Sequence, residues 1–509
     1  MQPLLTRIAT VVALALLLAA GAGGSKAAEP SQNPERRGIG LLDHKAVKRL
    51  LTTPRTASVH IDERKSIFVT DYEVLRLFSF DEVMEQLVRQ SGSHALTREQ
   101  LFEQWFDSAN PIGLFSLPFS GPNCDSGLLN GFPYTCPRDE GQLVLFDPFG
   151  PSTPATYTPI ALSNRFDLAG DPTQGDTDCG EYRIVFERNS GAINPANRSL
   201  IIFEAVLPNP QPDGRTLNGC LKVQDFWEDL SRKPVDVRAR LLHDFYFKGL
   251  AGYEPVVKIS HYGSATPKSK GQVRTNEFMA PDPSFPPDVT APGAPAAPHQ
   301  PWMLREFHLV LNGSSLRFEP VTVKTNPIAA LLNDSDPTQS AGPAFRSHFL
   351  TQVAALARPG LDTFSMTVPD TFNSGQSSEQ GPNPPGAEMD YAAAFGNATS
   401  AFVSAIQGQI PPGSGLQPKD IVNRAATQTC AGCHHLSGGV DMGGGQGAWP
   451  LTLGPVPAAL FTHEQLVDPD IGPDGPRYKI SPALENVFLP HRKCVMQAFL
   501  QHAQSANCP

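Results

Sequence analysis

The stretch Thr429-Cys430-Ala431-Gly432-Cys433-His434-His435 contains the pattern Cys-x-x-Cys-His. Two thiols three residues apart lie on one turn of the chain, so each can bond one vinyl group of the same porphyrin. The histidine that follows can then direct a ring nitrogen at the iron as the proximal axial ligand. The spacing predicts covalent attachment of one c-type haem at Cys430 and Cys433, with His434 as an iron ligand.

The same cysteines have three other uses to weigh: a Cys430–Cys433 disulfide, half of a zinc site, and a redox dithiol. Structural zinc needs two further Cys or His ligands at short, matched spacing. The next cysteine downstream, Cys494, has no partner two or three residues away. A redox dithiol is typical of a β-α-β setting, whereas a helical pattern precedes this motif and a glycine-rich loop follows it. We therefore prefer the haem interpretation.

Residues 418–428 predict a helix that runs into the motif, because Val422, Ala426 and Cys430 recur at every fourth position on one face. With the three motif residues, this helix makes residues 415–509 resemble a single-haem c-type cytochrome domain. The resemblance implies an α-helical fold for this part of the chain, haem attachment outside the bacterial cytoplasm, and electron transfer with an unidentified redox partner protein. It does not extend to the rest of the chain.

The second axial position of the iron is open to several downstream residues. His463 is preferred, because it follows an apolar run that can line the distal face of a haem; the alternative is a histidine at the start of a helix with no contact to iron. A methionine eight residues past His434 would require the chain to wrap the porphyrin edge tightly, which the neighbouring glycines allow. The candidates are His463, Met442, Met496, His491 and His502.

The sixth ligand decides the chemistry of such a haem. Two protein ligands saturate the iron and leave electron transfer alone, whereas a vacant position permits chemistry on O₂ or peroxide. Trp449, Arg477 and Arg492 are candidates for contacts with the haem propionates, and a surface position is the alternative for both arginines.

Residues 1–28 have the composition of a secretory signal peptide. Arg7 supplies the positive charge, residues 8–20 form the apolar core, and Ser25-Lys26-Ala27 offers small residues at the cleavage positions. The alternative is a retained N-terminal anchor. No later stretch is apolar over the roughly 20 residues that a membrane helix needs. We expect a periplasmic or secreted bacterial protein with no integral membrane segment after cleavage.

The composition bears on partners and on redox compartment. The net charge of −10 over 509 residues does not favour binding to nucleic acid or to an anionic membrane. Six cysteines remain outside the motif, and export would allow disulfides between those that lie close in sequence. The predicted pairs are Cys124–Cys136, Cys179–Cys220 and Cys494–Cys508.

Sequence patterns predict an α+β protein of several domains. Capping boxes begin helices near Ser79 and Thr97, and a helical region with a break at Pro234 spans 224–248. Further helices are expected at 327–332, 344–356, 391–406 and 490–502, and strands at 142–146, 182–186, 200–206 and 256–259, with a hairpin at 307–318 that turns at Asn312-Gly313. Residues 281–301 read as a linker or surface loop and 370–388 as a flexible loop.

The expected domains follow from these patterns. A β-rich α+β domain of unassigned role covers 29–325, a helical segment covers 326–410, and the haem domain covers 411–509. The boundary near 410 rests on the Pro- and Gly-rich residues 410–415.

Two polar features of the first domain have alternative interpretations. A run of acids is compatible with Ca²⁺ ligation, but EF-hand spacing is absent and ordinary turns are preferred; the acids are Asp167, Asp171, Asp176, Asp178 and Glu181. Residues 274–277 and 305–306 are polar clusters beside strands, and we interpret them as solvated faces.

The sequence is compatible with three functions. The first is an exported electron-transfer protein with one covalent haem. The second is a single-haem periplasmic oxidoreductase or peroxidase; a di-haem peroxidase is disfavoured because the chain has one Cys-x-x-Cys-His. The third is a non-redox binding or structural envelope protein in which a haem or a disulfide acts as a staple.

Overall fold

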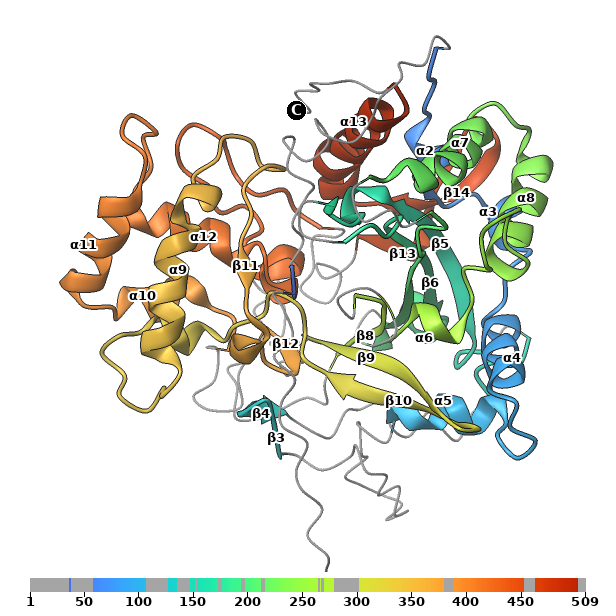
Figure 1. The fold of residues 1–509 in the computed structure, drawn as a ribbon, viewed down its shortest axis with the longest axis horizontal. Coiled ribbons are helices and arrows are strands. Elements are labelled where there is room, and N and C mark those ends of the chain that lie inside the picture. The colour runs from blue at the N-terminus through green and yellow to red at the C-terminus, as the bar shows by residue number, and fades with distance from the viewer. Residues whose placement is uncertain are drawn as a thin grey trace, which may run out of the picture. The chain divides into compact units, whose positions relative to one another are not determined.

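An antiparallel sheet forms the centre of the computed structural model (Figure 1). Within the described residues its strand order is β10-β9-β8-β7-β6-β5-β2, and β12 pairs with the other half of the β9 edge. The strands are β2 (Phe68–Val69), β5 (Tyr157–Arg165), β6 (Glu181–Arg188), β7 (Ser199–Val206), β8 (Gln272–Phe278), β9 (Trp302–Asn312), β10 (Ser315–Val321) and β12 (Gln376–Ser378). The structure describes residues 36–37, 58–106, 127–134, 147–151, 153–172, 176–193, 197–211, 216–263, 266, 270–278, 302–379, 388–452 and 463–501.

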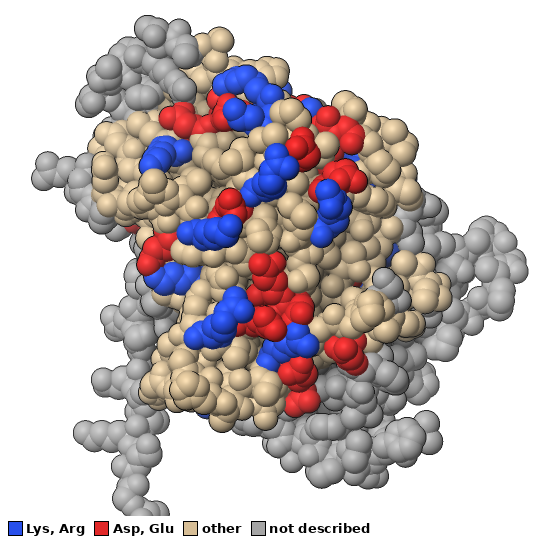
Figure 2. Space-filling model, turned by 90° about the vertical axis from the view of Figure 1, so that its right-hand side faces the viewer, with Lys and Arg blue, Asp and Glu red and all other residues tan. Residues whose placement is uncertain are grey.

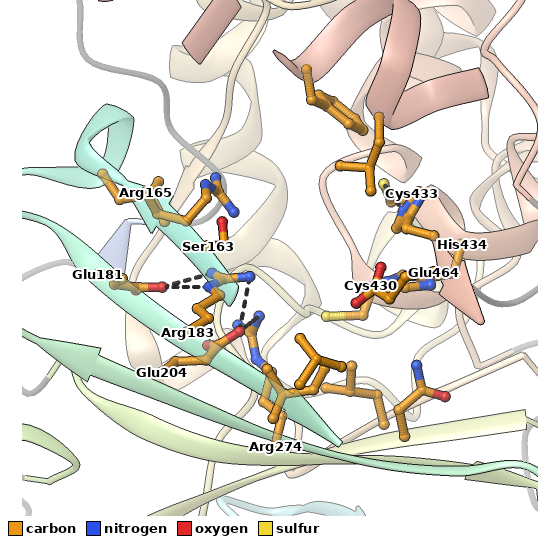
Figure 3. Close-up of a pocket in the computed structure, with 18 of the residues that line it drawn as sticks. Ser163, Arg165, Glu181, Arg183, Glu204, Arg274, Cys430, Cys433, His434 and Glu464 are labelled. Carbon is orange, nitrogen blue, oxygen red and sulfur yellow. Dashed lines mark hydrogen bonds and ion pairs between the residues drawn. The ribbon is translucent and has the colours of Figure 1, made fainter. Parts of the chain in front are cut away.

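The two faces of the sheet differ in chemistry. Successive side chains of a strand point to opposite faces, and β6 alternates charged and apolar residues along its first half. Tyr182 and Ile184 face a layer of helices, where Tyr182 stacks on Trp227 with ring centroids 5.9 Å apart. Glu181 and Arg183 point to the opposite face, where they line a cavity (Figure 3).

Helices cover the apolar face. Phe80, at the start of α4, contacts the rings of Phe186 and Phe203 on the sheet. The Ser79 hydroxyl accepts a hydrogen bond from the backbone N–H of Glu82, as the capping box predicts. The predicted break at Pro234 separates α7 from α8. The helices of this layer are α2 (Glu63–Ser66), α3 (Tyr72–Leu75), α4 (Phe80–Ser91), α5 (Arg98–Phe106), α6 (Ser190–Ile193), α7 (Leu221–Leu230) and α8 (Val235–Phe247).

A second core lies beyond the β9–β12 edge, where a group of helices packs together (Figure 1). Trp302 and Leu304 of β9 belong to this core, so the sheet and the helical group share buried side chains. The predicted helix at 391–406 is two helices, which separate at Asn397. The elements are η8 (Ala329–Leu332), α9 (Gly342–Leu356), α10 (Tyr391–Gly396), α11 (Ser400–Gln409) and α12 (Pro418–Ala426).

The C-terminal segment returns to the central sheet. Helix α13 (Leu489–Leu500) packs there, with the rings of Phe166 and Phe499 4.5 Å apart. A hairpin of β13 (Glu464–Gly472) and β14 (Gly475–Ile480) precedes it, which the helical expectation for 411–509 did not include. Residues Glu35–Pro509 form one contact unit, and the expected boundaries at 325 and 410 lie inside it. The division into separate domains stays a prediction.

Other sequence predictions had mixed outcomes. The hairpin with its turn at Gly313 is confirmed as β9–β10, and Gly313 has a φ of 61°. The strand predicted at 256–259 is wrong: the chain forms a 3₁₀ turn at Ile259–His261 instead. The loop predicted at 370–388 contains β12, which pairs with β9. The strand at 142–146 and the linker at 281–301 lie outside the described residues.

Smaller pairings complete the described strands. They are β1 (Arg36–Arg37) with β11 (Thr367–Val368), and β3 (Gly127–Leu129) with β4 (Phe132–Tyr134). Further short helical turns are η2 (Phe166–Leu168), η5 (Asn218–Cys220), η9 (Asp370–Phe372), η10 (Gly432–Leu436) and η12 (Leu484–Phe488).

The disulfide prediction is confirmed where the structure describes both cysteines. Cys179 and Cys220 are joined. Cys494 is also disulfide-bonded, and its predicted partner Cys508 lies outside the described residues. The Cys124–Cys136 prediction falls outside them as well. A disulfide is compatible with an oxidising compartment.

Charged side chains of both signs lie on the outer surface (Figure 2). On the face shown in Figure 2, positive and negative side chains are interspersed. The i,i+4 pairs Arg240–Asp236 and Lys233–Asp229 mix the two charges along the chain. This face therefore has no uniform charge that would attract a strongly charged partner.

In the described part of the chain, no helix combines the length and the apolar character that a bilayer crossing requires.

Candidate functional site

Helix α12 positions the Cys-x-x-Cys-His motif. A capping box between Gln417 and Asp420 begins the helix, and Val422 and Ala426 are buried on the face that continues to Cys430, as the periodicity predicts. The chain then makes a π-helical turn at Gly432–Leu436. Cys430 and Cys433 are both buried, and their thiols are not joined to each other.

Gly432 is required between the two cysteines by close packing of the backbone. A Cβ at this position would collide with the carbonyl oxygen of Ala426, at the end of α12. Only glycine lets the chain turn back against the helix here, which brings both thiols to the same side.

Both thiols and the His434 side chain line one cavity with a volume of about 160 Å³. A water molecule needs about 10–15 Å³ on this measure, so the cavity has room for roughly ten waters. Apolar side chains make up much of its wall: Phe68, Leu168, Val185, Leu200, Ile202, Leu304, Leu484 and Phe488. The cavity therefore suits a largely apolar ligand of molecular size.

The opposite wall is the charged face of the sheet (Figure 3). Strand register places Arg183 beside Ser163 on β5 and Glu204 on β7. Arg183 contacts Glu204 at 2.9 Å, and Arg274 contacts the same Glu204 oxygen at 3.1 Å and Glu306 at 2.6 Å. Removing one partner of such a buried network typically costs about 3–5 kcal/mol.

The positions of the residues on this wall show that one interpretation of the sequence was wrong. The wall also contains candidate functional residues that the sequence did not reveal. Residues 274–277 and 305–306 were interpreted as solvated faces, but Arg274 lies on the cavity wall and Arg305 and Glu306 are buried. The available signal was the alternation of charged and apolar residues inside strands, at Glu181, Arg183 and Glu204. The cationic lining residues that were missed are Arg165, Arg183, Lys270, Arg274 and Lys324.

Burial raises the pKa of both motif thiols to about 12. A reactive or redox-active cysteine requires a lowered pKa, because the thiolate is the nucleophile. The environment of Cys430 and Cys433 opposes the thiolate, so it does not favour the redox-dithiol interpretation.

His434 is held from two sides. The indole of Trp302 stacks on its ring, with centroids 5.2 Å apart and planes 25° apart. The Thr452 hydroxyl donates a hydrogen bond to the backbone carbonyl of His434 at 3.1 Å. The Trp302 indole N–H in turn donates to Asn276 on β8. The sheet thus contributes to the orientation of the predicted iron ligand.

Among the candidates for the second axial position, the structure brings His463 to the cavity. Its ring centroid lies 4.6 Å from that of His434, and its Nδ1 lies 2.9 Å from the Ser481 hydroxyl. Two rings on opposite sides of one iron stand about 6 Å apart, because each nitrogen–metal bond takes about 2 Å. A porphyrin between these two histidines therefore requires their rings to move apart.

Electrostatics keep His463 neutral. Burial, and then the neighbouring His434, lower its pKa well below the ordinary value. The next residue, Glu464, also lines the cavity, and burial raises its pKa to about 7. The cavity thus holds a neutral imidazole beside a carboxyl group that can be protonated near neutral pH.

The other axial candidates that the structure describes lie away from the cavity wall. Met442 is fully buried in a small cluster with Phe364 and Trp449. Met496 belongs to the core under the sheet. The Nδ1 of His491 lies 2.7 Å from Asp362. His502 is outside the described residues.

The three residues considered for propionate contacts are placed differently. Arg492 lines the main cavity and an adjoining one of about 20 Å³. Trp449 lines only the smaller one, and its indole N–H donates to the carbonyl of Cys433 at 3.4 Å. Arg477 is bound to Asp470 at 2.6 Å and lines neither. The surface alternative therefore does not apply to Arg492, which is buried.

Four of the five acids in the run form ion pairs with Arg or Lys side chains: Asp167, Asp176, Asp178 and Glu181. Asp167 accepts from Arg165, Glu181 from Arg183, and Asp178 from Lys270. Throughout the described ranges, no group of three or more His, Cys, Asp or Glu side chains is arranged to hold a metal ion. A haem needs no such group, since the porphyrin supplies most of the ligands.

Apart from the short distance between the His434 and His463 rings, the types of residue present fit a c-type haem. Such a haem has an apolar ring, two vinyl groups and two carboxylates. The cavity offers an apolar wall, two thiols that are not bonded to each other, an imidazole at the motif, and guanidinium groups. Comparisons of the chain with protein-family models, curated proteins and solved structures find no match.

Proposed function

We propose that this chain is an exported bacterial protein that carries one c-type haem and transfers electrons. Cys430 and Cys433 would bind the porphyrin covalently, and His434 would be the proximal iron ligand. One observation carries the proposal: both thiols and the His434 side chain open into a single cavity of about 160 Å³. Neither a disulfide nor a zinc site requires a cavity of this size.

The side chains around the cavity have separable roles in this proposal. Trp302 fixes the plane of the His434 ring by stacking. The sheet forms the opposite wall of the cavity. The bound haem would supply a one-electron Fe(III)/Fe(II) couple whose potential depends on burial and on nearby charges. The expected partner is a redox protein of unassigned identity, and the expected location is the periplasm or the medium.

A second function, catalysis at an open sixth position, is favoured by the surroundings of His463. Its neutral ring, the carboxyl group of Glu464 and the guanidinium of Arg492 all line the same cavity. His463 and Glu464 can hold or transfer a proton beside a bound oxidant, and Arg492 can donate hydrogen bonds to it. If His463 ligates the iron, this chemistry is blocked and electron transfer remains.

The test is spectroscopic. The full chain is expressed with its signal peptide in a bacterium that has haem-attachment machinery, and oxidised and reduced spectra are recorded with a pyridine haemochrome assay. We expect one covalent haem per chain in the wild type and none in the Cys430→Ala/Cys433→Ala variant. Colourless wild-type protein, or protein with a Cys430–Cys433 disulfide, would refute the proposal. A low-spin haem insensitive to CO favours electron transfer, and a high-spin haem favours catalysis.

A further inference from the structure

The cations on the cavity wall are not equally neutralised. Six are found among the described residues: Arg165, Arg183, Lys270, Arg274, Lys324 and Arg492. Five of them have close acceptors. Arg165 donates to Asp167 at 2.8 Å, Arg183 to Glu181 at 2.6 Å, Lys270 to Asp178 at 2.7 Å and Arg274 to Glu306 at 2.6 Å, and Lys324 donates to the side chain of Gln272.

Arg492 is the exception. Its closest carboxylate in the described structure is Asp167, at 3.9 Å from Nε, beyond hydrogen-bonding distance. Both oxygens of Asp167 already accept from Arg165, at 2.8 to 3.1 Å. The guanidinium carbon of Arg492 also lies 5.9 Å from the ring centroid of Phe488, a weak contact.

Burial makes it energetically unfavourable for Arg492 to lack a hydrogen-bonded carboxylate. Arg492 is only 8% exposed, and an arginine side chain does not lose its proton in proteins. A buried charge without a bound counter-ion is strongly unfavourable, and it is normally paired or ligated. The pKa of Arg492 is lowered well below its ordinary value, by burial first and then by Arg165, which agrees with a local shortage of negative charge.

A second unsatisfied donor lines the same cavity. The Ser163 hydroxyl is buried, and it has no hydrogen-bond partner in the described structure. Figure 3 shows it beside Arg165, on the strand that faces the thiols across the cavity. The cavity therefore contains a buried cation and a buried hydroxyl, and both can bind an anion.

We propose that Arg492 is the anion-binding residue of this cavity, and that its ligand is a carboxylate or a small oxyanion beside the haem. The proposal rests on the proposed haem function. Such an anion has two sources: a propionate of the porphyrin itself, or a small anion that enters from solvent. The charge, the burial and the missing partner are the same in both cases, so the experiment has an arm for each.

The experiment compares four full-length holoproteins: wild type, Arg492→Gln, Arg492→Lys and Arg477→Gln. The last removes the same charge from a neighbouring segment, at a residue outside the cavity. The first arm records the propionate-bending band by resonance Raman spectroscopy, together with the reduction potential. The second arm titrates nitrite and formate and follows the Soret band.

If a propionate is the ligand, Arg492→Gln shifts the Raman band, and Arg477→Gln does not. The loss of positive charge also favours the ferric form about tenfold, which is about 59 mV for one electron. If a small anion is the ligand, wild type shows a saturable response, and Arg492→Gln binds at least tenfold more weakly. Either result supports the proposal, and Arg492→Lys should lie between wild type and Arg492→Gln.

The proposal is overturned if Arg492→Gln matches wild type in both arms, or if Arg477→Gln gives the same changes. If Arg492→Gln does not fold, the Lys variant decides by the same two readouts. The haemochrome assay on wild type distinguishes failure of the proposed haem function from failure of the proposed role of Arg492. A negative assay overturns the haem function and this inference with it, whereas a positive assay without an Arg492 effect overturns the inference alone.

Discussion

Asp167 offers a test of how strongly the buried charges at the cavity hold the fold. The carboxylate accepts three hydrogen bonds from Arg165 and is fully buried. The change Asp167→Asn keeps the shape of the side chain but removes its charge. Arg165 then loses its hydrogen-bonded counter-ion, and the more distant Arg492, at 3.9 Å, loses the attraction of the same charge.

The magnitude follows from the pKa of Asp167. Burial alone would raise this pKa, but Arg165 and Arg492 outweigh burial and lower it from 3.8 to about 2. At 1.36 kcal/mol per pKa unit, the ionised form is stabilised by about 2.4 kcal/mol in the folded state. We expect Asp167→Asn to lower the free energy of unfolding at pH 7 by about 2–3 kcal/mol, within the range for a broken buried pair.

The pH dependence has a definite sign. A carboxyl group whose pKa is lowered on folding contributes stability above its unfolded pKa, and this stability disappears as the pH falls through the folded pKa. The difference between wild type and Asp167→Asn should therefore be constant from pH 7 to about pH 4. It should shrink between about pH 4 and pH 2.

Urea denaturation of both proteins across this pH range measures the difference. Asp470→Asn is the matched control, because Asp470 also pairs with an arginine but its side chain is 43% exposed. Exposed pairs contribute about 0–1 kcal/mol. The reasoning fails if Asp167→Asn costs no more than the control at pH 7, or if its effect grows as the pH falls below 4.

Three further predictions concern other parts of the chain. Gly432→Ala should abolish haem incorporation, measured by the haemochrome assay, because the added Cβ would collide with the backbone of α12. Gly408→Ala is the control: it has open space around it and should be neutral or stabilising. Replacing both Cys179 and Cys220 by Ser should destabilise the protein by about 4 kcal/mol in urea, from the entropy of a 41-residue loop; unchanged stability would contradict this. Burial raises the pKa of Glu388 to about 8, so its ionisation destabilises the fold as the pH rises above the unfolded value. Glu388→Gln should therefore stabilise the protein by more than about 1 kcal/mol at pH 8 and much less at pH 5, and equal effects at the two pH values would sink this explanation.

Local patterns predicted much of the described secondary structure. The capping box at Ser79, the break at Pro234 and the turn at Gly313 each depend on residues within a few positions of one another, and all three have the predicted outcome. The wrong predictions of secondary structure occur where pairing between strands that are distant in sequence decides whether a segment is a strand. Strand β12 sits in a stretch predicted to be a loop, and it is a strand because β9 pairs with it.

The candidate site divides in the same way. The Cys-x-x-Cys-His spacing by itself predicts a binding site, because two thiols and an imidazole within five residues can reach one ligand. The register that aligns Arg183, Glu204 and Arg274 could not be predicted, because these residues lie on three strands. Without that register, their charges looked like a solvated face.

The sequence by itself determined the prediction of haem attachment, because that prediction depends on the spacing of five consecutive residues. Only the tertiary structure decided where the motif lies and what faces it. A strand shows by its period of two that its faces differ, but not which face is covered or by what. Here the charged face of the sheet lies opposite cysteines more than 150 residues further along the chain than Arg274, and that packing turns a surface pattern into the wall of a cavity.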